Sequence, residues 1–149
     1  MADDKMITAL CRALFDHNVL ILWKPAYELK IPVIDEQHRT IVAIINSLFY
    51  AIQNGHGEKM LTSISNIMCE YTRIHFELEE DYLIRCDFFE MTEHKRLHAE
   101  LVDKLIKFGE EDVRGQAPTE FLNFLKEWWL EHICVKDMVF RNYLAGMRG

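Results

Sequence analysis

Hydrophobic residues recur at helical spacing in four long segments of the chain, and almost no stretch alternates strictly between apolar and polar residues. The first segment covers residues 32–53 and the second about residues 58–85. The third ends near Gly109, and the fourth begins at Pro118. A period near 3.6 residues is typical of amphipathic helices, so the predicted fold class is all-α.

One face of each segment is apolar, and these faces are predicted to meet in a common core. Before the third segment, Asp87 is followed three residues later by Glu90, which is a capping signal and predicts a helix that starts just after Asp87. The inward-facing residues are expected to include Ile34, Ile41, Ile45, Leu48 and Ile52, then Leu61, Ile64, Met68, Tyr71, Leu78 and Tyr82, then Leu97, Leu101, Leu105 and Phe108, and finally Phe121, Leu125, Trp128, Val135 and Val139.

Short connections between helices of about 20 residues favour antiparallel neighbours. The chain is therefore predicted to form an antiparallel up-down four-helix bundle over residues 23–149. Residues 1–22 are expected to be a short N-terminal extension. Its apolar residues have the spacing of a fifth short helix packed outside the bundle: Ile7, Leu10, Cys11, Leu14 and Phe15.

Composition and charge narrow the class of protein and of partner. Half of the 149 residues are hydrophobic, which suffices for one globular domain, and the net charge of −7 disfavours nucleic acid and anionic lipid. The apolar run Val19–Trp23 is too short to span a bilayer, so we expect no membrane helix and no signal peptide. The four cysteines lack CxxC spacing, which favours free thiols in a reducing cytoplasm. We expect a monomer, with weak oligomerisation as the alternative.

Five of the seven histidines fall on the predicted inward faces, where each buried imidazole needs a partner. His94 and His98 are four residues apart and so project from one helical face, and His75 and Glu79 repeat that spacing. His132 and Asp137 are five apart, which a regular helix separates by about 140°. A π-type turn would bring both inward. The five histidines are His38, His75, His94, His98 and His132.

Imidazole and carboxylate ligands without thiolate suit iron, manganese or zinc, and they disfavour an iron–sulfur cluster. Gln37 precedes a candidate ligand and either supports the site or faces water. Glu77 and Glu80 are expected on a solvated face, His17 and His56 in solvent, and Cys134 in packing.

Several short motifs together carry a resemblance to a known family. They are Trp23, Ile34–His38, His75–Glu80, the pair His94 and His98, and His132–Ile133 followed by Asp137. In this order the chain resembles a bacterial member of the hemerythrin family over about residues 23–143. Each motif is weak alone, whereas seven ligand-type residues in order on the expected helices are specific.

The resemblance implies a centre of two iron ions, Fe2+ or Fe3+, joined by an oxo or hydroxo bridge. It assigns His94, His98 and His132 to one iron and His38 and His75 to the other, with Glu79 and Asp137 bridging both. The second iron then keeps an open position for an exogenous ligand. The resemblance thus implies reversible binding of dioxygen, or of another small diatomic or anionic ligand, by a carrier, store or sensor that is not an enzyme.

Other functions stay open beside this interpretation. A ferritin-like di-iron enzyme is disfavoured because no Glu in the chain has a His three residues later, and HExxH is absent. A helical interaction module without metal is compatible with the bundle alone. A di-iron module that responds to redox state, nitric oxide or peroxide is the main alternative.

Two positions depart from the family pattern. Trp129 stands three residues before His132, where the family has leucine beside the open iron. A tryptophan is larger and carries an N–H donor, so we expect it to restrict the ligand pocket, to gate it, or to donate a hydrogen bond to the ligand. Lys30 stands in the loop before the first helix, where the family pattern has glycine.

Overall fold

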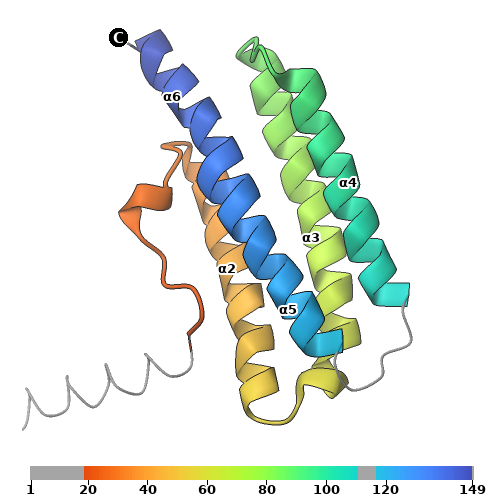
Figure 1. The fold of residues 1–149 in the computed structure, drawn as a ribbon. Coiled ribbons are helices and arrows are strands. Elements are labelled where there is room, and N and C mark those ends of the chain that lie inside the picture. Colours follow the sequence, from red (N-terminus) through yellow and green to blue (C-terminus); the bar gives the residue numbers. More distant parts are fainter. Residues whose placement is uncertain (1–18, 111–116, 149) are drawn as a thin grey trace, which may run out of the picture.

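The computed structural model describes residues 19–110 and 117–148, which form an all-α bundle of four long helices (Figure 1). The predicted helix within residues 1–18 lies outside the described part. The bundle consists of α2 (Pro32–Gln53), α3 (Gly57–Arg85), α4 (Met91–Glu110) and a fourth helix made of α5 (Ala117–Trp128), the π-helical segment η2 (Trp129–Lys136) and α6 (Asp137–Arg148). A 3-10 turn, η1 (Pro25–Tyr27), precedes α2. The predicted fold class is confirmed.

Successive helices run in opposite directions, as predicted for short connections (Figure 1). Pro32 occupies the first turn of α2, where its missing N–H costs no helical hydrogen bond. At the start of α3, a Cβ on Gly57 would lie 2.9 Å from Ile52 Cγ1 and 3.1 Å from Pro118 Cβ. Glycine therefore lets the α2–α3 connection pass close to the start of α5.

The predicted start of the third helix is wrong by several residues. Asp87 has a φ of 50°, in the left-handed region, and lies in the turn that follows α3. The chain becomes helical at Met91, and the carbonyl of Glu90 accepts a hydrogen bond from the backbone N–H of His94. Aspartate tolerates left-handed backbone better than most residues, so the same side chain that suggested a helix start ends the preceding helix.

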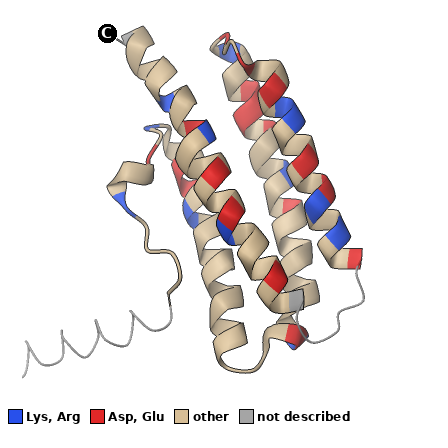
Figure 2. Cartoon of the chain, in the orientation of Figure 1, with Lys and Arg blue, Asp and Glu red and all other residues tan. Residues whose placement is uncertain are grey.

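The core consists of two apolar clusters with a polar layer between them. On α2, His38 lies between Ile34 of one cluster and Ile41 of the other. On α3, Glu79 lies between Phe76 and Leu83 in the same way. Two dry layers therefore enclose the polar side chains from both ends of the bundle. Charged residues instead follow the outer surface and are dense along α4 (Figure 2).

Three of the expected inward residues are exposed instead. Leu78 is 38% exposed, because it lies at the edge of the apolar face of α3. Val135 and Val139 are 57% and 37% exposed, and Ile133 and Phe140 are buried in their place. The π-helical segment shifts the register of the fourth helix, so a stripe extrapolated at 3.6 residues per turn leaves the core after Trp128.

The segment before α2 lies along the outside of the bundle (Figure 1). Asn46 Oδ1 accepts hydrogen bonds from the backbone N–H groups of Leu20 and Ile21, and Asn46 Nδ2 donates to the Ile21 carbonyl. Lys30 has a φ of 65°, which explains why glycine suits this loop position. Among the helices that the structure describes, none combines the length and apolar character that a membrane crossing requires.

Candidate metal centre

The helices bring all seven predicted ligand residues into the buried polar layer. Each of them is at most 5% exposed. Buried imidazoles and carboxylates at this density have to find their partners within the layer itself. The contributing residues are His38 from α2, His75 and Glu79 from α3, His94 and His98 from α4, His132 from η2 and Asp137 from α6.

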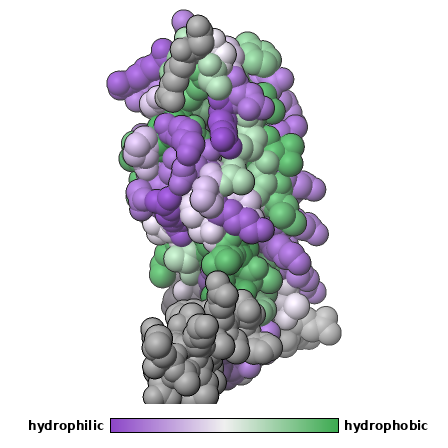
Figure 3. Space-filling view, turned by 90° about the vertical axis from the view of Figure 1, so that its left-hand side faces the viewer, coloured by the Kyte–Doolittle hydropathy of each residue, from purple (hydrophilic) through white to green (hydrophobic). Residues whose placement is uncertain are grey.

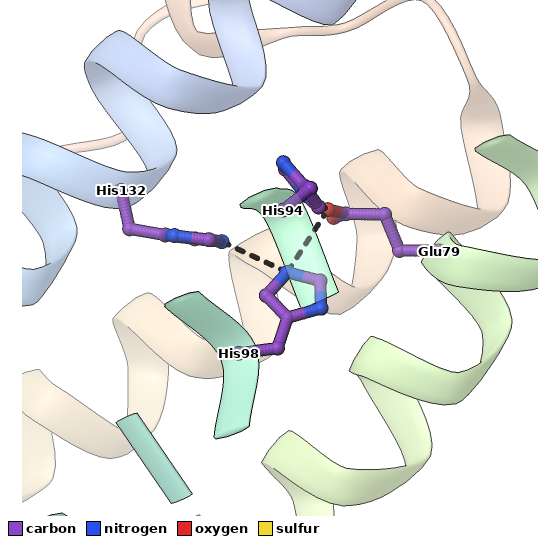
Figure 4. A group of neighbouring side chains, drawn as sticks. All are labelled: Glu79, His94, His98 and His132. Atoms are coloured by element: carbon purple, nitrogen blue, oxygen red, sulfur yellow. Dashed lines mark hydrogen bonds and ion pairs between the residues drawn. The ribbon is translucent and has the colours of Figure 1, made fainter. Parts of the chain in front are cut away.

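The first group of converging side chains is Glu79, His94, His98 and His132 (Figure 4). One ligand atom from each residue lies within 4.8 Å of the others. His94 Nε2 is 2.5 Å and His98 Nε2 is 3.4 Å from Glu79 Oε1. His98 Nε2 and His132 Nε2 are 3.1 Å apart. Ligands that share an ion at about 2.0–2.2 Å are about 3 to 3.5 Å from one another, so the two distances from His98 Nε2 suit one metal ion, whereas the shorter distance between His94 and Glu79 is that of a hydrogen bond.

The second group is His38, His75, Glu79 and Asp137, whose ligand atoms also lie within 4.8 Å of one another. His38 Nε2 and His75 Nε2 are 3.2 Å apart. His75 Nε2 is 3.2 Å from Glu79 Oε2, and His38 Nε2 is 3.3 Å from Asp137 Oδ2. This group repeats the spacing of the first but contains two imidazoles in place of three.

Both carboxylates lie between the groups and direct one oxygen toward each. Glu79 Oε1 faces His94, whereas its Oε2 faces His75. Asp137 Oδ1 is 3.4 Å from His132 Nε2, whereas its Oδ2 is on the His38 side. A carboxylate in this position can bind two cations at once, one through each oxygen, which is the geometry a bridging ligand needs.

The π-helical segment explains how His132 and Asp137 reach the same layer. The backbone N–H of Asp137 donates to the carbonyl of His132, five residues earlier, in place of the usual four. The wider turn removes the offset of about 140° that a regular helix would impose over five residues. The sequence prediction of a wide turn at this place is confirmed.

The carboxylates give the layer a field that favours positive charge. Burial alone would lower the pKa of His38, but Asp137 and Glu79 outweigh it and raise that pKa to about 9. Burial would likewise raise the pKa of Glu79, but the surrounding histidines, with His94 hydrogen-bonded to Oε1, hold that pKa well below its usual value. At His132, burial outweighs the attraction of Asp137 and Glu79 and lowers the pKa to about 4.

Several buried ligand atoms have no hydrogen-bond partner within the described part of the chain. They include Glu79 Oε2 and both carboxylate oxygens of Asp137. Leaving such acceptors unpaired in a dry layer is costly, and paired cations remove that cost. The donor set therefore fits two bound cations better than it fits a layer of protons alone.

Two further side chains accept hydrogen bonds from the Nδ1 atoms of two of the histidines, which point away from the centre. His75 Nδ1 donates to Gln37 Oε1 at 2.9 Å, and His98 Nδ1 donates to Glu80 Oε1 at 2.8 Å. Each bond leaves the Nε2 lone pair free to bind a metal. The expectation that Glu80 is merely solvated is wrong, because α4 packs against its side of α3. No spacing within α3 carries that information.

Aromatic rings cover the two groups differently. Phe76 stacks on His98 at a centroid distance of 3.6 Å, and Trp128 stacks on His132 at 6.4 Å. On the other side, the rings of Trp129 and His38 pack in an edge-to-face arrangement with centroids 6.3 Å apart. Trp129 is 1% exposed and lies beside His38 of the two-histidine group.

The remaining candidates lie away from the centre. His56 is exposed in the loop between α2 and α3, as expected, and His17 lies outside the described residues. Cys134 is partly buried against the larger apolar cluster, and burial raises the pKa of its thiol. This placement agrees with a packing role.

Comparison with known proteins gives a consistent assignment. The hemerythrin HHE cation-binding domain matches residues 29–144. A bacteriohemerythrin of Clostridium acetobutylicum is 30% identical over 124 residues, which cover 79% of this chain and 96% of that protein. A bacteriohemerythrin of Stenotrophomonas maltophilia is 25% identical over 81% of this chain and 79% of its own length. A hemerythrin-like protein of Naegleria gruberi is 28% identical over 74% of this chain and 82% of its own length. With its histidines and carboxylates arranged as two metal-binding groups, the chain belongs to the hemerythrin family.

Proposed function

We propose that the protein is a non-haem di-iron protein that binds dioxygen reversibly. The observation that carries the proposal is the unequal division of ligands, with three histidines in one group, two in the other and two carboxylates shared. Nitrogen and oxygen ligands without thiolate suit iron. Two bound irons would supply the two electrons that reversible dioxygen binding requires.

The side chains around such a centre would have different roles. Glu79 and Asp137 hold two cations together and offset their charge within a dry layer. His38 and His75 supply one nitrogen fewer than the opposite group, so their side keeps room for an exogenous ligand. The apolar clusters on both sides exclude water, which supports binding without consumption of a substrate.

The same reasoning favours a binding protein over an enzyme. The described side chains around the centre are metal-ligand residues, their hydrogen-bond partners and apolar rings. We further propose that the protein is a monomer and that it is cytoplasmic, the latter in keeping with the free thiols of Cys69, Cys86 and Cys134 in the described part of the chain.

An anaerobic reconstitution with ferrous iron tests the function. The optical spectrum is recorded before air, in air, and after removal of oxygen under argon. A charge-transfer band that appears in air and disappears under argon supports reversible binding. Irreversible oxidation without such a band would contradict it.

A second candidate function follows from Trp129, which fills the side where the ligand would bind. A ring in that position favours a di-iron module for redox, nitric oxide or peroxide responses, with restricted access for oxygen. Anaerobic titration with nitric oxide and with hydrogen peroxide separates the two candidates, because this function requires a faster reaction with either of them than with oxygen.

A further inference from the structure

A surface pocket of about 380 Å³ lies between the segment that precedes α2 and the end of α5. This segment runs along the left of the bundle in Figure 1, the side that faces the viewer in Figure 3, where hydrophobic and hydrophilic patches alternate. The volume could hold several water-sized molecules or small ions at about 30 Å³ each. Its lining includes Leu20, Leu22, Lys24, Tyr27, Lys126 and Trp129.

Trp129 separates this pocket from the metal centre. Trp129 lines the pocket, and its ring also packs edge-to-face against His38 of the two-histidine group. The rings of Trp23 and Tyr27 pack edge-to-face against the Trp129 ring, with centroid distances of 6.0 and 5.4 Å. Trp129 Nε1 is buried without a hydrogen-bond partner in the described residues, so the ring holds an unsatisfied donor beneath the surface.

The charge of the pocket differs from that of the molecule. Two lysines line it, the other lining residues are uncharged, and no carboxylate of the described chain lines it, although the net charge is −7. A pocket of about 310 Å³ beside the start of α2 differs, because three carboxylates, Glu28, Asp35 and Glu36, line it together with two cations, Lys30 and Arg39, which form ion pairs with Glu28 and Glu36. An anion is therefore attracted at the pocket beside Trp129, where the lysines face no lining carboxylate, whereas at the pocket beside α2 the carboxylates outnumber the cations and pair with them.

We propose that the pocket at Lys24, Lys126 and Trp129 is an access vestibule that selects small monoanions for the two-histidine side of the centre. The lysines raise the local concentration of anions, and displacement of the Trp129 ring limits passage to the centre. Only one part of this proposal rests on the proposed function, namely that the anions are delivered to a metal centre. Capture of anions at Trp129 depends on residues that are present without metal.

Stopped-flow mixing of azide with the diferric protein tests the charge of the vestibule. Replacing Lys24→Gln together with Lys126→Gln should lower the association rate about three- to tenfold at low salt and leave the dissociation rate unchanged. The difference should vanish at about 1 M salt, where the screening length falls to about 3 Å. Lys59→Gln with Lys95→Gln makes the same change in net charge at exposed positions away from the vestibule and should have little effect.

A neutral ligand separates charge from size. Association of nitric oxide with the diferrous protein should not depend on the two lysines. Trp129→Leu should raise the association rates of both azide and nitric oxide, because it removes the wall for either ligand. Equal azide rates in the vestibule and control variants, or a Trp129→Leu protein with unchanged rates for both ligands, would overturn the proposal.

Quenching of tryptophan fluorescence gives a readout that needs no metal. In a Trp23→Phe and Trp128→Phe background, Trp129 is the remaining tryptophan of the chain. Removing both lysines should weaken quenching by iodide and leave quenching by neutral acrylamide unchanged. A protein that holds two irons but forms no azide adduct would contradict the proposed function. Iodide quenching that is equal with and without the two lysines would contradict the vestibule.

Discussion

Glu80→Gln probes the hydrogen bond that supports the three-histidine group. Glu80 Oε1 accepts from His98 Nδ1 at 2.8 Å, and the Glu80 side chain is 24% exposed. A carboxylate in this position increases the basicity of the opposite nitrogen, which is the atom that faces the first group. Glutamine keeps an acceptor oxygen of similar reach and removes the charge.

The expected effect is a loss of metal affinity without a loss of fold. Changing such a partner typically lowers metal affinity by about 10- to 100-fold. We expect about tenfold, or about 1.4 kcal/mol, because glutamine retains the hydrogen bond and water partly screens Glu80. The matched change Gln37→Glu introduces the charge behind His75, where the neutral amide now accepts from Nδ1, and should strengthen metal binding on that side.

Anaerobic competition with a ferrous chelator at constant pH measures the affinity of each variant. Glu77→Gln is the control, because Glu77 is exposed on the same helix and its replacement makes the same change in net charge. Melting curves of the metal-free proteins should agree within a few degrees. If Glu80→Gln and Glu77→Gln release iron at the same chelator concentration, the Glu80 carboxylate does not tune His98 and the reasoning is refuted.

Four further outcomes are expected. Saturated protein should hold close to two irons per chain by metal analysis, and a ratio near one or zero would contradict the dinuclear site. Glu79→Ala or Asp137→Ala should lower iron retention and the melting temperature of the loaded protein together, since bound metal stabilises only the folded state; unchanged melting in both variants would count against bridging. Lys30→Gly should raise the free energy of unfolding by about 1 kcal/mol, because it relieves left-handed strain and loses only an exposed ion pair with Glu28; denaturant unfolding with no increase would contradict this. Trp129→Leu should stay folded at a cost within about 3–5 kcal/mol and shorten the lifetime of the oxygenated protein, measured as an autoxidation time course; an unchanged lifetime would show that the ring does not keep water out.

The sequence alone was sufficient for the class of fold and for the ligand types. Hydrophobic spacing within a helix is fixed by 3.6 residues per turn, so four apolar stripes predict four helices wherever the chain is regular. The spacing of His94 and His98 fixes one shared face in the same way, and the five-residue spacing of His132 and Asp137 indicated where regularity had to end.

Contacts between helices were decided only by the tertiary structure. Glu80 reaches His98 because α4 lies against its side of α3, and the distance between them depends on how each helix is rotated rather than on the 18 residues that separate them in the chain. The prediction that Val135 faces inward was wrong for a related reason, because the π-helical segment changes the rotation of the helix that follows it. The direction of each carboxylate oxygen and the pocket behind Trp129 likewise arise where three or more elements meet. Local periodicity determines which residues face inward, whereas packing determines which of them meet.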